Sequence, residues 1–597
     1  MAAQPLKSGS ATERAEAQPA RAPTPVAARE LTLRAVLFGC AVGVLLAAGN
    51  VYTGLKTGFI DGGGITAALL GFAFFSTFNG LGRGPFGKLE NNVSQTTASS
   101  AAIMGFAIGL PGAIPALQLL GHTYPGWALV VWGVGVGGVG IFVAVVLRRK
   151  LVVNEALPFP TGAATAEVIE TISTSRSTAL FRARMLVVAA LVAMAVTWFR
   201  DGRPSPIPQT TAFGGAVLGV SLASLSVGVS WSPLLVSTGV LMGVRSAFSM
   251  LLGGFTFWVC IAPWLVRSQI VPGPGYSQDL PWITWPAVGL LLSSSFVPLV
   301  MEWRGLARSF RDIPMLLRRR REAVDDGLAA ADRFRLARPL LLVSVLLILV
   351  VARLLFDLPL LATAFGLLIA LVLANVCART TGETDMAPTG VLGTLTQVTF
   401  GGTGFVTSLF TGSITSGVGA QTAQTLWAFR AGNQLRASPR AQVWAEILGA
   451  VLGAIVSVPV YMVIVKAYGL GTVAMPSPSA ISWKATAQAV IGGLSAMPRY
   501  AGVAGLVGFG VGVVLSTLAR GRWGRFVPSA AAMGMAALSP FSLSFSVFLG
   551  GLLLLVYGRL RPAAESGHTL MSVAAGGIAG ESIMAVIIAI LIATGAL

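Results

Sequence analysis

Polar and ionisable residues gather between positions 379 and 397, inside a chain that is otherwise almost continuously apolar. This stretch, RTTGETDMAPTGVLGTLTQ, holds two carboxylates, Glu383 and Asp385, together with the helix breakers Gly382 and Pro388. Apolar segments on both sides place it at or within the depth of a membrane. Charged groups and broken helices are costly there, and they normally persist only where protein or a water-filled cavity shelters them. We therefore predict that the stretch is part of a path for a solute.

Further polar clusters interrupt other apolar segments. The candidates for binding a solute are amides, a phenol, a carboxylate and two cations: Asn50, Tyr52, Lys56, Gln95, Asn154, Glu155, Gln397, Gln421, Gln424 and Arg430. Glycine and proline residues beside them free backbone N–H and C=O groups, which can bind a solute if they line a cavity. A structural interpretation stays open as well, because a lysine such as Lys56 also serves as an anchor at the membrane interface.

Three carboxylates are candidates for carrying a coupled proton: Glu383, Asp385 and Glu581. Glu581 is the only charged residue in the apolar segment 571–596. Desolvation disfavours the charged form of a carboxylate in such a place, which suits a group that binds and releases a proton. Two alternatives stay open. Glu581 can be hydrogen-bonded to a helix end, and Glu383 and Asp385 can lie in a loop with ordinary solvated charges.

The composition is that of a membrane protein. Hydrophobic residues make up 54% of the 597 positions and charged residues only 11%, whereas a soluble protein carries about a quarter charged residues. The mean hydropathy is +0.79. The net charge of +19 is spread over short loops, so basic residues at cytoplasmic helix ends explain it better than nucleic-acid binding.

Cysteine and histidine are too scarce for a dedicated metal site. The three cysteines lie in apolar runs, and the two histidines are far apart in the sequence. We therefore expect no metal ligands and no cofactor. A metal ion that passes through the protein would arrive already bound to a chelator.

The apolar runs predict an all-α, polytopic integral membrane protein of roughly 16 helical elements. We divide it into a disordered cytoplasmic tail at 1–30, an N-terminal transmembrane half at 31–301, a basic cytoplasmic loop at 302–338 and a C-terminal transmembrane half at 339–597. The N-terminal half is expected to have eight crossings, one of them at 212–229. Ten arginines place the basic loop, and with it the N-terminus, inside the cell. The segment LPFPTGAATAEVI at 157–169 is too short and too proline-rich to cross, so we expect a re-entrant or broken helix.

The two halves resemble each other faintly. Asn50 and the following TGLKTG motif echo Asn375 and TTGETD, and Gln95 echoes Gln421 at nearly the same offset. An even number of crossings per half predicts a parallel repeat with the solute site at the interface between the halves. Chance matching of small and polar residues is the alternative.

Six motifs in order resemble the oligopeptide transporter (OPT) superfamily, which includes the yellow-stripe-like metal-chelate transporters. They are NVYTGLKTG, ENNVSQT, LPFPTGAATAEVI, TGETDMAPTGVLGTLTQ, RAGNQLRASPRAQ and GGIAGES, from Asn50 to Glu581. The resemblance implies a fold of about 16 helices and proton-coupled symport of peptides or metal chelates. The GETDMAPTG stretch looks closer to the general and bacterial members, which favours oligopeptides.

The function that we expect is therefore proton-coupled symport of small oligopeptides, with metal–siderophore or metal–amino-acid chelates as the alternative substrates. The partners would be the substrate, protons and the lipid bilayer, with homo-oligomers open and no nucleic acid. The expected location is a bacterial inner membrane. An enzyme is disfavoured, because the sequence has no HExxH or GxSxG motif and no histidine near the acid clusters. A channel stays open as a further alternative.

Overall fold

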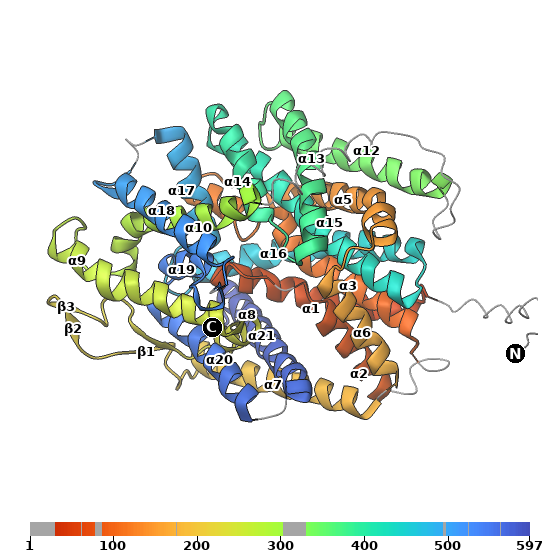
Figure 1. Ribbon diagram of the computed structural model, residues 1–597, viewed down its shortest axis with the longest axis horizontal. Coiled ribbons are helices and arrows are strands. Elements are labelled where there is room, and N and C mark those ends of the chain that lie inside the picture. Colours follow the sequence, from red (N-terminus) through yellow and green to blue (C-terminus); the bar gives the residue numbers. More distant parts are fainter. Residues whose placement is uncertain are drawn as a thin grey trace, which may run out of the picture.

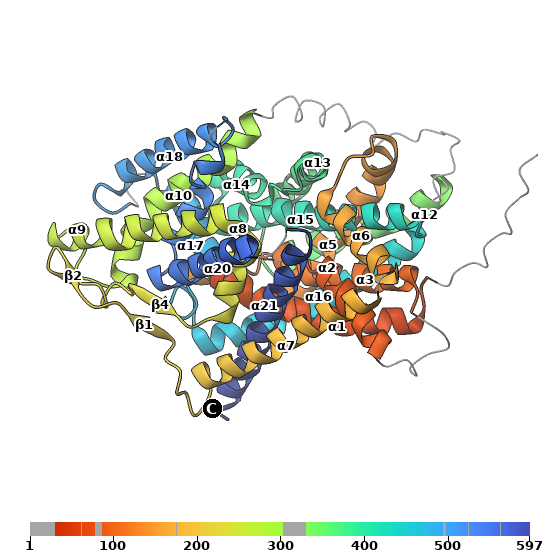
Figure 2. The same cartoon turned by 60° about the horizontal axis from the view of Figure 1, so that its bottom comes forward.

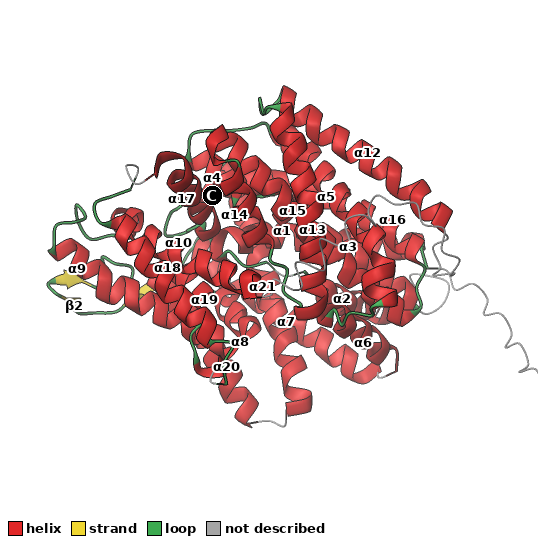
Figure 3. Cartoon of the chain, turned by 45° about the horizontal axis from the view of Figure 1, so that its top comes forward, coloured by secondary structure: helices red, strands yellow, loops and turns green. Residues whose placement is uncertain are grey.

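The computed structural model describes residues 30–60, 62–77, 86–174, 176–301, 330–493, 497–522, 524–560 and 563–597. The predicted tail, apart from residue 30, and the greater part of the predicted basic loop lie outside these ranges. Within them, twelve helices are long and apolar enough to cross a membrane. The prediction of an all-α polytopic membrane protein is thereby confirmed (Figure 3).

Helices form nearly all of the described chain (Figure 1). The first part contains α1 (Leu33–Thr57), α2 (Gly64–Thr77), α3 (Lys88–Ile108), α4 (Ala113–Leu119), α5 (Gly126–Arg148), the π-helix η1 (Arg149–Asn154), α6 (Pro160–Thr174), α7 (Arg176–Asp201), α8 (Pro233–Gly254), the π-helix η2 (Phe255–Ile261), α9 (Ala262–Arg267) and α10 (Tyr276–Met301). The second part contains α12 (Ala330–Leu354), α13 (Leu360–Thr384), α14 (Thr389–Thr399), the 3-10 helix η3 (Gly401–Thr403), α15 (Phe405–Leu435), α16 (Pro439–Tyr468), α17 (Pro478–Gly492), α18 (Ala501–Leu518), the 3-10 helix η5 (Gly524–Phe526), α19 (Ala530–Ala537), α20 (Phe541–Leu560) and α21 (Ala563–Thr594).

Two hydrophobic cores hold the helices together. The larger core joins α1, α3, α5, α12, α13, α15 and α16, and aromatic rings fill its centre: Phe356 stacks on Phe410 with ring centroids 4.3 Å apart, and Trp132 meets both rings edge-on. The smaller core joins α10, α17, α18 and α19 to η2 and the start of α20. Helix α21 packs along α7 at the boundary between the two groups (Figure 2).

Close helix contacts depend on glycine where the backbones approach each other. Gly39 and Gly43 of α1 lie against Ser94 and Ala101 of α3. An added Cβ at Gly39 would lie only 2.7 Å from the Ser94 carbonyl oxygen, so a larger side chain would force the two helices apart.

The prediction that residues 212–229 cross the membrane is wrong. This segment lies in a β structure between α7 and α8, where β1 (Thr210–Ala212) pairs antiparallel with β4 (Gly228–Ser230), and β2 (Ala216–Val217) pairs with β3 (Val220–Ser221). Its Val, Leu and Phe residues raise the hydropathy of a window, but valine prefers strands and the many glycines prefer turns, so the segment does not form a helix.

The expected parallel repeat is also wrong, because the two halves run in opposite directions. Helices α1 and α3 are parallel, and so are α13 and α15, as the contacts of Gly366 with Thr411 and of Cys377 with Gly419 show. However, α3 and α15 are antiparallel, since Ser100 contacts Gln421 and Ile108 contacts Ser413. The parallel expectation depended on the count of crossings in each half, and that count fails at 212–229 and at the short helix α2, so it does not decide the direction.

Candidate functional site

Helix α2 starts inside the bundle and not at its surface. After α1 ends, the chain turns back, so that Gly63 lies against Leu46 of α1 and Ala102 of α3. The helix then begins at Gly64 and has 14 residues, too few to cross a bilayer, which takes about 20. The positive end of a half-helix is therefore placed at mid-depth, where it can attract an anionic group.

Amide side chains surround this helix start, and we call Gln95, Gln424, Thr165 and the backbone of 62–64 the amide cluster. A Cβ on Gly64 would lie 3.3 Å from Gln95 Oε1 and 3.4 Å from Thr165 Oγ1, and a Cβ on Gly62 would lie 3.0 Å from Gln424 Oε1. The three polar side chains are buried, and Gln424 Oε1 has no hydrogen-bond partner among the described residues. The cluster can therefore bind an additional donor.

A second cluster lies beside the first on the same face of α15. We call Glu446, Gln421, Thr425 and Ser100 the acid cluster. Glu446 on α16 is fully buried, and its Oε2 accepts hydrogen bonds from Gln421 Nε2 and Thr425 Oγ1, both at 3.1 Å. Gln421 Nε2 also donates to Ser100 Oγ at 3.1 Å, and the cluster thereby connects α3, α15 and α16.

Glu581 is the only charged residue in the segment 571–596, but charged groups of other helices contact it. Its Oε1 accepts from Lys56 Nζ at 3.0 Å and from Arg200 Nη2 at 3.1 Å, and its Oε2 accepts from the backbone N–H of Leu234 at 2.9 Å. Ser232, the N-cap of α8, donates to the same carboxylate. This ion-pair network joins α1, α7, α8 and α21. The Glu581 carboxylate is also hydrogen-bonded to the start of α8, which agrees with the alternative that Glu581 binds a helix end.

The predicted site residue Tyr52 belongs to the same network. Its hydroxyl oxygen accepts from Lys56 Nζ at 2.8 Å, and Arg200 is bound in addition by the neighbouring Asp201. Two cations and two anions therefore share this buried region. The charges compensate each other, and Lys56 already donates hydrogen bonds to Tyr52 and Glu581.

The GETD segment contacts the LPFP segment at a place that we call the junction. Asp385 accepts from the backbone N–H of Thr161 at 3.0 Å, from the Thr161 hydroxyl at 2.6 Å and from Trp427 Nε1 at 2.8 Å. The carboxylate therefore stabilises the first turn of α6, where negative charge is favourable. Asp385 itself adopts a left-handed backbone conformation with φ of 63°.

The other charged residues of the junction form a chain of ion pairs. Arg379 is bound to Glu155 at 2.9 Å and to Glu383 at 3.3 Å. Glu155, Glu383 and the neighbouring Asn154 are exposed. The junction thus brings Glu155 next to Glu383 and Asp385, although Glu155 is far from these two residues in the sequence.

Three further predicted residues remain: Asn50 and Gln397 lie apart from these clusters, and Arg430 lies next to the junction. Asn50 donates through Nδ2 to the Ala102 carbonyl at 3.0 Å. Gln397 is buried and donates to the Trp483 carbonyl at 2.9 Å. Arg430 is partly buried beside Gly162 at the start of α6, and its Nε has no hydrogen-bond partner among the described residues.

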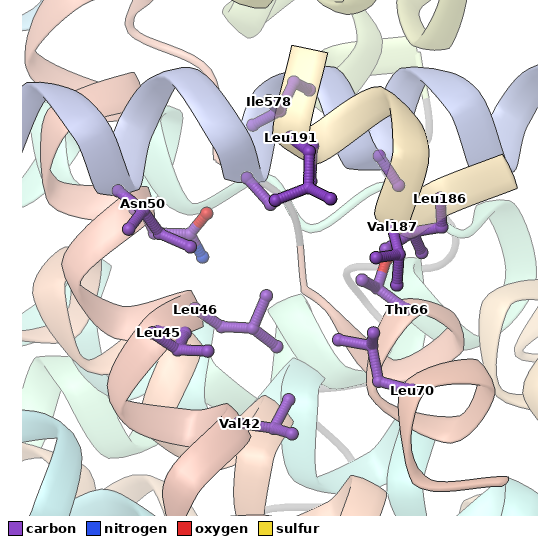
Figure 4. A pocket seen from close by; sticks show the side chains of 15 residues that line it. Val42, Leu45, Leu46, Asn50, Thr66, Leu70, Leu186, Val187, Leu191 and Ile578 are labelled. Atoms are coloured by element: carbon purple, nitrogen blue, oxygen red, sulfur yellow. The ribbon is translucent and has the colours of Figure 1, made fainter. Parts of the chain in front are cut away.

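A cavity of about 180 Å³ lies between α1, α2, α7 and α21 (Figure 4). Its wall is apolar except for Asn50 and Thr66. It opens beside Leu45 and Leu191, which are 45% and 59% exposed on membrane-spanning helices. Because such exposed leucines face the hydrocarbon of a bilayer, we do not place the solute there.

The sequence analysis missed Glu446 and Arg200. Glu446 follows the RAGNQLRASPRAQ motif in an apolar segment, and a solitary carboxylate in such a segment is the signal that was used for Glu581. Arg200 gave no comparable signal, because an arginine at a helix end is explained as an interfacial anchor. Only the fold shows that it is buried against Glu581.

Comparisons with known proteins agree with the motifs. The OPT oligopeptide transporter family matches residues 30–592. A Saccharomyces cerevisiae protein named as an oligopeptide transporter, YGL114W, is 25% identical over 74% of this chain and 79% of its own, and a Haemophilus influenzae protein named in the same way is 24% identical over 91% and 92%. An Arabidopsis thaliana protein named as metal-nicotianamine transporter YSL8 is 25% identical over 93% and 85%. The resemblance inferred from the motifs is confirmed, and the chain belongs to the OPT oligopeptide transporter family.

Proposed function

We propose that this transporter carries small peptides across the membrane together with protons. The observation that supports a solute site most directly is the start of α2 inside the bundle, facing Gln424 Oε1, which lacks a hydrogen-bond partner among the described residues. A buried polar atom without a partner costs about 1–3 kcal/mol, so its retention favours a role in binding. Peptide N–H groups are the donors that such an oxygen needs.

The amide cluster supports recognition of the peptide backbone. Gln95, Gln424 and Thr165 would meet its N–H and C=O groups, and the positive end of α2 favours a carboxylate. Of the two cations expected to meet a carboxylate, Lys56 is bound to Glu581. Arg430 is therefore the proposed cationic partner of the substrate.

The antiparallel crossing of α3 and α15 supports an alternating-access mechanism. Inverted repeats commonly move against each other around a site at their interface. The amide cluster lies at this interface, because Gln95 belongs to α3 and Gln424 to α15. We propose that the junction between Asp385 and Thr161 opens and closes one entrance to the site.

The orientation follows from the arginine-rich segment at 302–338. By the positive-inside rule, it and the N-terminus would lie in the cytoplasm. The membrane would be the inner membrane if the source is bacterial. Labelling of single cysteines introduced near residue 320 and into the exposed loop at 120–125, with a membrane-impermeant reagent on intact cells, tests this orientation.

Metal chelates are the second candidate substrates, supported by the similarity to a protein named as a metal-nicotianamine transporter. A chelate of amino-acid type offers carboxylates and amines, which the same amide cluster can bind. Purified protein in liposomes distinguishes the candidates. We expect an inward proton gradient to accelerate uptake of a labelled tripeptide, and unlabelled di- to tetrapeptides to compete better than iron or nickel chelates. Uptake that is unaffected by the gradient would rule out proton coupling.

A further inference from the structure

We propose that Glu446 is the residue that binds and releases the coupled proton, an inference that rests on the proposed proton-coupled symport. Its position meets the requirement for such a group: a carboxyl inside the membrane, next to the substrate, whose charge no permanent partner compensates. A separate observation supports each part of this requirement.

The first observation is burial without a cation. Glu446 is 0% exposed, and no lysine or arginine in the described part of the chain forms an ion pair with it. The described residues that donate to its carboxylate are the neutral Gln421 and Thr425, with the neutral Ser100 beside them. An ionised carboxylate held by two neutral donors in a low-dielectric interior is unstable, so this environment favours the protonated acid.

The second observation is the balance of donors and acceptors in the acid cluster. Glu446 Oε1 and Gln421 Oε1 are both buried, and neither has a hydrogen-bond partner among the described residues. The cluster therefore has more acceptors than donors. A proton on Glu446 supplies an additional O–H donor for these acceptors, whereas an ionised Glu446 supplies none.

Three cations of the surrounding helices contact groups other than Glu446. Arg34 of α1 pairs with Glu90 of α3, and Lys56 of α1 pairs with Glu581 of α21. Arg148 of α5 lies over the Phe429 ring. The remaining groups on helices packed against α16 are Cys40 and Tyr52 of α1, Lys88 of α3, Arg430 of α15, Glu565 and His568 of α21, and α16 itself carries Arg440, Tyr461, Lys466 and Tyr468.

The third observation is the distance along α15 to the amide cluster. Gln421, Gln424 and Thr425 are spaced by three and four residues and therefore share one helix face. Gln421 and Thr425 bind Glu446, while Gln424 faces the α2 start. A substrate in the amide cluster can therefore alter the hydrogen bonds around Glu446 through one turn of helix.

The proposed step is a simple transfer. The Glu446 carboxylate takes a proton from water on the side of higher proton concentration and becomes the neutral acid. The neutral acid allows the loaded protein to change its conformation, and it returns the proton to water on the other side. The other carboxylates are less suited, because Glu581 is held by two cations and Asp385 stabilises the first turn of α6.

The test compares Glu446→Gln with wild type in liposomes. Glutamine imitates the protonated acid, so we expect the variant to fold, to lose at least 10-fold in gradient-driven tripeptide uptake and to retain exchange of labelled for unlabelled tripeptide. The exchange should also lose its dependence on pH. Glu90→Gln is the matched control, because Glu90 is a buried carboxylate paired with Arg34, and its gradient-driven uptake per folded protein should stay near that of wild type.

Two further measurements make the result decisive. Infrared difference spectra of wild type should show a carboxylic acid C=O band that changes on substrate binding and is missing in Glu446→Gln. If the Gln variant does not fold, Glu446→Asp, which keeps the carboxyl group, should show slower but still gradient-driven uptake. Driven uptake by Glu446→Gln at the wild-type rate would overturn this inference alone. A wild type that ignores the gradient would refute the symport, and the role of Glu446 with it.

Discussion

Lys56 Nζ lies 3.0 Å from Glu581 Oε1, although 525 positions separate the two residues. This ion pair joins the end of the first helix to the middle of the last, and Arg200 binds the same carboxylate oxygen from α7. All three side chains are nearly or completely buried. A buried ion pair of this kind fixes the relative positions of its helices, because neither partner can be left alone without a large cost.

We therefore predict that Glu581→Gln lowers stability. The substitution leaves Lys56 and Arg200 without the charge that compensates them, and removal of one partner of a buried ion pair costs about 3–5 kcal/mol. A melting curve of the detergent-solubilised protein measures the loss. As a control, Asp357→Asn removes the exposed ion pair with Arg353 and should leave the melting temperature nearly unchanged.

Transport by the Glu581→Gln variant separates its two possible roles. If Glu581 is structural, gradient-driven uptake and substrate exchange fall together in proportion to the amount of folded protein. A variant that is stable, exchanges substrate and fails only in gradient-driven uptake would identify Glu581 as a coupling group, as the sequence analysis expected.

The junction gives a second prediction, with a matched pair of carboxylates in one segment. Asp385→Asn should lower the free energy of unfolding by about 1–2 kcal/mol, because the amide keeps Oδ1 for two of the three donors but loses the charge and the Oδ2 that accepts from the Thr161 hydroxyl. Glu383→Gln should have a much smaller effect, since Glu383 is exposed. Equal effects in chemical denaturation would contradict the assignment of Asp385 to the first turn of α6.

The fold class could be predicted from the sequence, because long apolar runs have few alternatives to membrane-spanning helices. The direction of the repeat could not. It is visible only in the antiparallel contacts of α3 with α15, which a hydropathy pattern does not reveal. The echo between Gln95 and Gln421 was informative nevertheless, since both side chains belong to polar clusters at the α3–α15 crossing.

The candidate site was predictable by residue type but not by partner. Polar residues beside glycine indicated Gln424 as a candidate for binding a solute, and the structure places it as a buried amide whose Oε1 has no hydrogen-bond partner among the described residues. The same reasoning described Glu581 as an isolated carboxylate, because Lys56 and Arg200 reach it from helices that are distant in the sequence. Pairing of charges across helices is a property of the packing, so a pattern within one segment does not reveal it.

The crossing of α3 and α15 can be tested through one glycine. A Cβ at Gly417 would lie 2.1 Å from the Ala107 carbonyl oxygen, so Gly417→Ala must push the two helices apart. We expect a loss of about 1–3 kcal/mol, which is typical of overpacking. Gly510→Ala is the control, because no atom lies within 4 Å of the added Cβ and alanine favours the helix. A melting temperature that rises in both variants would show that the helices do not approach so closely.

The amide cluster gives the last prediction, which separates binding from folding. Gln424→Ala should raise the KM for tripeptide uptake about 2- to 10-fold, because a lost hydrogen bond to substrate costs about 0.5–1.5 kcal/mol. Its effect on stability should be small, since Gln424 Oε1 has no partner to lose in the described structure. Gln442→Ala should do the reverse: Gln442 Nε2 donates to the Ala428 carbonyl at 2.6 Å, so stability should fall while the KM of the folded protein stays unchanged. An unchanged KM in Gln424→Ala would exclude the start of α2 as the place where the substrate binds.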